Sequence, residues 1–206
     1  MSDAATILYA EPDIRRRVAE LGMAISEDYA GRSPVLIALL KGGTVFLADL
    51  FREIRLPVRV DFMSISPYGE ASEAARVVRI VKDLDQDIGG EDVIIVEDIV
   101  DTGLTLSYLM STLESRGPRS MEVCALLDRA AVRIAPLQVR YRGFDCPTSF
   151  VIGYGLDLGA RYRNLPHILS VEDPEALAAD PGLLPPGLEA TSRGDGSETA
   201  SSDGHG

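Results

Sequence analysis

The stretch Val93–Val96 is apolar at every position, and it constrains the fold more than any other feature. A strand with one solvated face alternates polar and apolar residues, whereas a strand covered on both faces of a parallel sheet does not. Strand-like apolar runs also occur at 34–40, 58–65 and 121–127, between helical patterns at 12–30, 44–52 and 105–116. Strands that alternate with helices in this way predict an α/β fold, with a central parallel sheet flanked by helices.

The size of the chain and its cysteines limit the class of protein. The chain has 206 residues, of which 46% are hydrophobic, and this suffices for one domain with a substantial core. No apolar run approaches the roughly 20 residues of a membrane span, and the N-terminus lacks the pattern of a signal peptide. Cys124 and Cys146 lack CxxC spacing, which argues against a disulfide scaffold or a zinc site. We expect a cytoplasmic protein without a membrane partner.

The formal net charge of −12 is unevenly distributed. Eight acids and one base lie from Glu172 onward, so the preceding part of the chain is only mildly acidic. Binding to nucleic acid is therefore disfavoured, because it requires a dense basic face. The sequence predicts a domain over residues 1–171 and an acidic tail over 172–206, rich in Pro, Gly and Ser and disordered apart from a short helix at 174–179.

Three acids, Glu97, Asp98 and Asp101, follow the buried strand directly. In open α/β sheets, ligands bind beyond the carboxyl ends of the strands. The turn at 101–105 opens a helix, whose N-terminus offers free N–H groups to a phosphate, and Gly103 permits a close approach. The acids could orient sugar hydroxyls, hold a hydrated Mg²⁺ or accept a proton. An ordinary helix cap is the alternative, but it explains one or two of the acids and not the Glu97–Asp98 pair.

The whole stretch 93–106, VIIVEDIVDTGLTL, closely resembles the phosphoribosyl-diphosphate-binding signature of type I phosphoribosyltransferases, and its form is closest to that of the hypoxanthine-guanine enzymes. Further segments follow in the order of that family: LLKGG (39–43), VDFMSISPYG (60–69), VVRIVKDLDQDIGG (77–90), ALLDR (125–129) and FVIGYGLDLGARYRNLPHI (150–168). The resemblance spans roughly residues 7–171. It implies a parallel sheet with a small hood built from the chain ends. It also implies transfer of a 5-phosphoribosyl group from its diphosphate donor to a purine nitrogen, with Mg²⁺ and release of pyrophosphate.

The resemblance also implies roles for individual residues. Asp101 would be the general base that accepts the proton of purine N7, and Glu97 and Asp98 would face the ribose hydroxyls, partly through Mg²⁺. The turn that includes Lys41 would bind pyrophosphate, and a non-proline cis peptide is often found at the pair matching Leu40–Lys41. The implied donor site comprises Lys41, Gly42, Glu97, Asp98, Asp101, Thr102, Gly103, Leu104, Thr105 and Arg163.

For the purine, the resemblance implies that the ring of Phe150 stacks on the base and that the backbone of Val151 binds its edge. Asp157 would bind a second Mg²⁺ beside them. Arg129 departs from the family, because many relatives carry a lysine that donates to the purine O6. Of the 20 basic residues 18 are Arg, so Arg129 could reflect this general preference with function retained; alternatively, it shifts base preference toward xanthine or away from guanine.

A second departure is Pro67, where the family has a serine before Tyr68. The resemblance implies a lid at about 66–76, including Ser66, Pro67 and Tyr68, that closes over the site and excludes water. A proline fixes its own φ and biases Ser66 toward extended backbone. Pro67 therefore constrains the backbone of the lid in a way that the serine of the family does not.

Three hypotheses follow. The first is a purine salvage enzyme that makes IMP and GMP from hypoxanthine and guanine. The second is a non-catalytic regulator that keeps the donor-binding fold, although the acidic body disfavours an RNA-binding version. The third is a relative that acts on another base, such as xanthine, orotate or adenine. In each case the resemblance implies a homo-oligomer, a dimer or a tetramer.

Overall fold

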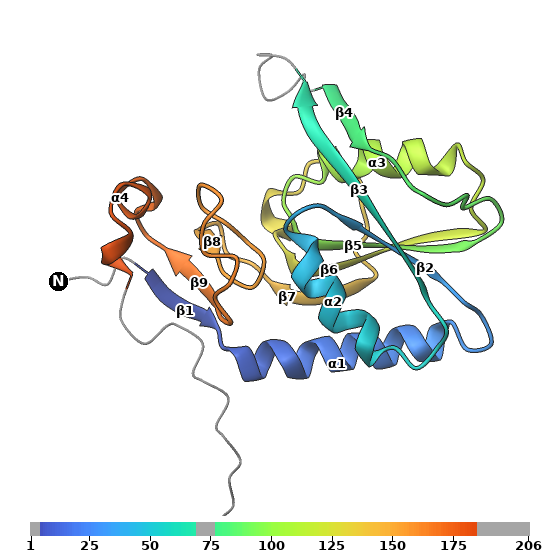
Figure 1. Ribbon diagram of the computed structural model, residues 1–206, viewed down its shortest axis with the longest axis horizontal. Coiled ribbons are helices and arrows are strands. Elements are labelled where there is room, and N and C mark those ends of the chain that lie inside the picture. Colours follow the sequence, from blue (N-terminus) through green and yellow to red (C-terminus); the bar gives the residue numbers. More distant parts are fainter. Residues whose placement is uncertain (1–4, 69–76, 185–206) are drawn as a thin grey trace, which may run out of the picture.

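The computed structural model describes residues 5–68 and 77–184 (Figure 1). Its main sheet has six strands in the order β4-β3-β2-β5-β6-β7, and only the β3–β4 pair is antiparallel. The predicted α/β class, with a largely parallel central sheet, is confirmed. The strands of this sheet are β2 (Val35–Leu39), β3 (Arg59–Tyr68), β4 (Val77–Lys82), β5 (Asp92–Val100), β6 (Ser120–Asp128) and β7 (Tyr141–Asp145).

Helices cover both faces of this sheet (Figure 1). Ile94 and Val96 of β5 pack into a core with α1 and α2, whereas Val93 and Ile95 pack into a second core with α3. All four side chains are fully buried. A strand needs apolar residues on both faces under these conditions, and this explains the uninterrupted apolar run. The helices are α1 (Glu11–Asp28), α2 (Gly43–Glu53) and α3 (Leu104–Glu114).

The chain ends form a second, smaller sheet beside the main one, in the order β1-β9-β8 (Figure 1). This is the hood that the resemblance implied. The short helix expected at 174–179 is present as α4, and its Leu177 is fully buried in the core of the hood. Residues 185–206 of the expected tail lie outside the described residues. The elements of the hood are β1 (Ala5–Tyr9), β8 (Phe150–Ile152), β9 (Ile168–Val171), α4 (Pro174–Ala179) and a 3-10 turn (Pro181–Leu183); a second 3-10 turn, Ala130–Val132, follows β6.

The lid residues are placed differently from the expectation. Ser66, Pro67 and Tyr68 lie in β3 rather than in a loop, and they pair with β4 in an arm that projects beyond the sheet (Figure 1). β3 pairs with β2 only as far as Met63, so Pro67 occupies an edge position, where a missing N–H is tolerated. Residues 69–76 of the expected lid lie outside the described residues.

Candidate active site

A cavity of about 360 Å³ lies at the carboxyl edge of the main sheet. Its walls come from the ends of β2 and β5, which are neighbours although β3 and β4 separate them in the sequence. The order of the strands reverses between β2 and β5, and such a switch point is where α/β sheets bind ligands. Nine of the residues expected at the site line this cavity: Gly42, Glu97, Asp98, Asp101, Thr102, Gly103, Thr105, Asp157 and Arg163.

Glu97 and Asp98 lie within β5, whose last residue is Val100. Burial raises the pKa of Glu97 well above its ordinary value, and the neighbouring charge of Asp98 raises it further. Burial also raises the pKa of Asp98, and this effect exceeds the opposing effect of a hydrogen bond from the Ile99 N–H, 2.9 Å long. Both carboxyl groups therefore resist ionisation in the free protein, and a bound cation would favour their charged forms.

The turn after β2 packs directly against Asp98. A Cβ atom built on Gly42 would lie 1.6 Å from Asp98 Oδ2, so only glycine leaves room for this carboxylate. The non-proline cis peptide implied for Leu40–Lys41 is present just before Gly42. The side chain of Lys41 is exposed and is not part of the cavity wall.

The turn after β5 leads into α3. Gly103 has a φ of 75°, in the left-handed region that favours glycine, and it caps the helix without a side-chain hydrogen bond. Among the described residues, no hydrogen bond uses the backbone N–H groups of Thr102, Gly103, Leu104 or Thr105. Free N–H groups at a helix N-terminus can bind an anion, as the sequence predicted for this turn. Leu104 is exposed and contributes only backbone to this arrangement.

Arg129 forms an ion pair with Asp101, in which Nη1 lies 2.9 Å from Oδ1. Its other nitrogens donate to backbone carbonyls before β8: Nε to Pro147 at 2.7 Å and Nη2 to Ser149 at 2.6 Å. The resemblance implied a role for Arg129 at the purine O6, and neither the ion pair nor the backbone contacts were expected from the sequence. The guanidinium group therefore joins the expected general base to the segment that carries Phe150.

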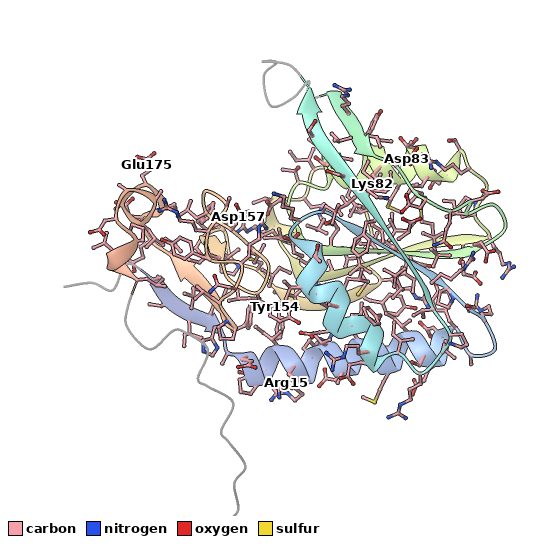
Figure 2. All side chains as sticks on the ribbon, viewed as in Figure 1. Arg15, Lys82, Asp83, Tyr154, Asp157 and Glu175 are labelled. Carbon is pink, nitrogen blue, oxygen red and sulfur yellow. The ribbon has the colours of Figure 1, made fainter. Side chains whose placement is uncertain are left out.

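The remaining expected residues come from the hood side of the cavity. Asp157 lies on the loop after β8, between the small sheet and the main sheet (Figure 2). It pairs with Arg163 at 2.6 Å and accepts a hydrogen bond from the N–H of Ala160 at 2.8 Å. Phe150 is 40% exposed and leaves part of its ring free, whereas Val151 is buried. The stacking and edge-binding roles implied for these two residues stay predictions.

The fold and this site together define a type I phosphoribosyltransferase. A parallel sheet carries a hood made from both chain ends, and a carboxylate pair precedes a helix N-terminus at the switch point. The chain belongs to the family of the phosphoribosyl transferase domain, whose model matches residues 4–158.

Two curated relatives match this chain over 85% and 96% of their own length. The chain is 47% identical over 172 residues to a hypoxanthine-guanine phosphoribosyltransferase of Mycobacterium avium, covering 81% of this chain and 85% of that protein. It is 45% identical over 170 residues to a hypoxanthine phosphoribosyltransferase of Escherichia coli K12, covering 82% and 96%. A crystal structure of a hypoxanthine-guanine phosphoribosyltransferase from Bacillus anthracis superposes with a TM-score of 0.78 at 43% identity, covering 81% of this chain and 98% of that one.

Proposed function

We propose that the protein is a purine salvage enzyme. It transfers the 5-phosphoribosyl group of 5-phosphoribosyl 1-diphosphate to hypoxanthine and guanine, and it releases IMP or GMP and pyrophosphate. The observation that carries this proposal is the cavity in which the carboxylate pair Glu97 and Asp98, a helix N-terminus and a third acid, Asp101, converge. One relative named for both bases and one named for hypoxanthine alone match over most of their length and support the choice of substrate.

The chemistry follows from the positions of the acids. As pyrophosphate leaves, positive charge develops at the ribose C1, and carboxylates fixed beside the ring stabilise this charge. Glu97 and Asp98 are held for this role by β5. The purine nitrogen forms the new bond to C1, and the N7 proton passes to the carboxylate of Asp101. Asp101 is half exposed at the cavity rim, where it can reach an incoming base.

Mg²⁺ is the cofactor that fits these residues. Within the described part of the chain, no three acidic, His or Cys side chains gather into a complete metal cage. Mg²⁺ does not require one, because it binds through one or two carboxylates and fills its other positions with water and phosphate oxygens. Glu97, Asp98 and Asp157 would supply the protein oxygens. The bound ion would neutralise charge on the departing pyrophosphate, and Lys41 and Arg163 would contribute to the same end.

The choice among 6-oxopurines depends on Arg129. Its guanidinium group lies between Asp101 and the backbone before Phe150, so it is near the proposed base site. Xanthine, which carries an extra carbonyl oxygen, is the alternative substrate. A non-catalytic regulator that only binds the donor is the alternative from another class.

No helix among the described residues is long and apolar enough to span a membrane. We further propose that the enzyme works in the cytoplasm and that it forms a homo-oligomer, a dimer or a tetramer.

A panel of bases tests the proposal directly. Purified protein is mixed with donor and Mg²⁺ and with hypoxanthine, guanine, xanthine or adenine, and nucleotide formation is measured. We expect turnover with hypoxanthine and guanine. Asp101→Asn keeps the shape of the side chain and removes the base, so turnover should fall by a factor of about 10² to 10⁴ while donor binding persists. Absence of nucleotide with every 6-oxopurine would refute the proposal, and size-exclusion chromatography with light scattering gives the oligomeric state.

A further inference from the structure

The segment 129–135 forms hydrogen bonds to the end of β5 and to the turn that follows it. Three consecutive carbonyl groups accept hydrogen bonds from this segment: that of Val100 at the end of β5, and those of Asp101 and Thr102 in the turn. Val100 O accepts from the N–H of Arg129 at 2.9 Å. Asp101 O accepts from Arg133 Nε at 2.9 Å, and Thr102 O accepts from the N–H groups of Ile134 and Ala135 at 2.9 and 3.0 Å. All three carbonyl oxygens therefore point toward the segment 129–135.

The direction of these carbonyls decides where the N–H groups point. In a planar trans peptide, the C=O of one residue and the N–H of the next point in opposite directions. With the carbonyls of Asp101 and Thr102 fixed toward the segment 129–135, the N–H groups of Thr102 and Gly103 face away from it. Both residues line the cavity. The hydrogen bonds from the segment 129–135 therefore orient toward the cavity the N–H groups that would bind the 5-phosphate.

Arg133 is the side chain at the centre of this arrangement. It is 12% exposed and forms an ion pair with the buried carboxylate of Asp128, the last residue of β6. Its guanidinium also donates to Val100 O at 3.3 Å and to Leu137 O at 3.4 Å. Its Cδ lies 2.8 Å from the position of a Cβ built on Gly103, so it supports the turn by contact as well as by hydrogen bonds.

We propose that Arg133 is a positioning residue for the phosphate-binding turn. Resting on the donor site proposed above, this inference names the residue that fixes the geometry of that site. Arg133 is absent from the cavity wall, so it acts through the turn and not on the substrate. The fork of the guanidinium is essential, because it donates to Asp128 and to two successive carbonyls at once, and a lysine ammonium cannot span these acceptors.

The test separates the two halves of the donor. Dissociation constants of ribose 5-phosphate and of Mg²⁺-pyrophosphate are measured by calorimetry for the natural protein and for Arg133→Lys. Ribose 5-phosphate needs the turn, whereas pyrophosphate is expected at the Gly42 side of the cavity. We expect ribose 5-phosphate to bind about tenfold more weakly, the equivalent of one hydrogen bond, and pyrophosphate to bind within about twofold of the natural protein.

Arg119→Lys is the matched control. Arg119 also pairs with a buried aspartate, Asp92, at 2.9 Å, but this pair lies at the amino ends of β5 and β6, the far edge of the sheet from the cavity. Arg119→Lys should leave both dissociation constants unchanged. A purely structural role for Arg133 predicts that its variant loses thermal stability and binds both ligands equally well or equally poorly, and either result overturns the inference.

Asp128→Asn keeps the test decisive if Arg133→Lys does not fold. The amide retains a hydrogen-bond acceptor and loses the charge that holds the guanidinium, so ribose 5-phosphate binding should weaken in the same selective way, by a smaller factor. Unchanged ribose 5-phosphate binding in a folded Asp128→Asn protein contradicts the inference. Failure of the proposed function would appear elsewhere, as an absence of turnover by the natural protein with the panel of bases.

Discussion

Gly42→Ala is the sharpest perturbation of the proposed donor site. The new Cβ would lie 1.6 Å from Asp98 Oδ2 and 2.5 Å from Asp98 Cγ, whereas real Cβ atoms do not approach another atom within 3.0 Å. The carboxylate oxygen must therefore retreat by about 1.4 Å. The backbone itself accepts alanine without strain, because Gly42 has a φ of −59° and a ψ of −49°. The substitution thus acts almost entirely through the position of Asp98.

The size of the effect follows from this displacement. A misplacement of about 1 Å at a catalytic group can lower activity by about a hundredfold, and crowding in a packed region costs about 1–3 kcal/mol of stability. We therefore expect kcat/KM for the donor to fall about a hundredfold, measured by steady-state formation of IMP. The melting temperature should fall by several degrees, because each kcal/mol corresponds to about 2–4 °C for a chain of this length.

Two comparisons make this prediction specific. Gly89→Ala is the control, because the Cβ added there meets its nearest atom, Asp87 Oδ1, at an ordinary 3.4 Å, and activity should be unchanged. In an Asp98→Ala background the carboxylate that the new Cβ would meet is absent, so Gly42→Ala should lower activity little further. Normal activity of the single variant, or equal losses from Gly42→Ala with and without the Asp98 carboxylate, would show that the contact does not matter.

Three further predictions concern Glu97, Tyr154 and Arg129. The pKa of Glu97 is higher in the folded than in the unfolded chain, so its contribution to stability is present below the pKa of an unfolded glutamate, about 4.3, and is lost as the pH rises through the folded value. The melting temperature of Glu97→Gln should therefore exceed that of the natural protein at pH 8, by a margin that shrinks as the pH is lowered. A margin that does not change with pH would contradict this. Tyr154→Phe removes the 2.6 Å hydrogen bond to Asp49 that joins the hood side to α2 (Figure 2). Thermal unfolding should show a decrease of about 1 kcal/mol in the free energy of unfolding, or about 3 °C in melting temperature, and an unchanged melting temperature would show that the bond does not stabilise the fold. Arg129→Lys can keep only one of the three contacts to Asp101, Pro147 and Ser149, so KM for hypoxanthine should rise about tenfold and KM for the donor should change little; an equal rise in both would exclude a role confined to the base site.

Local patterns were sufficient to predict the main elements. The periods of apolar residues placed α1, α2 and α3 within one or two residues of their observed ends. The apolar run at 93–96 predicted a strand buried on both faces, and Ile94 and Ile95 do pack into separate cores. Pairing between strands is not local, however. The extension of β3 through Pro67 depends on its register with β4, which is why Ser66, Pro67 and Tyr68 were expected in a lid loop and not in a strand.

The contacts of Arg129 and Arg133 show what limits a prediction of the site itself. Arginine makes up 18 of the 20 basic residues, so neither position is distinguished by its residue type. What distinguishes them is the parallel register that pairs Val100 with Asp128, so that β5 and β6 end side by side and the residues after them emerge together. Asp101 then meets Arg129, and the turn meets Arg133. In the same way, the pairing of Ala38 with Val96 brings Gly42 against Asp98. The residues of the site on the main sheet thus come from the ends of β2, β5 and β6, and their contacts are set by the order of these strands, which the local sequence does not contain.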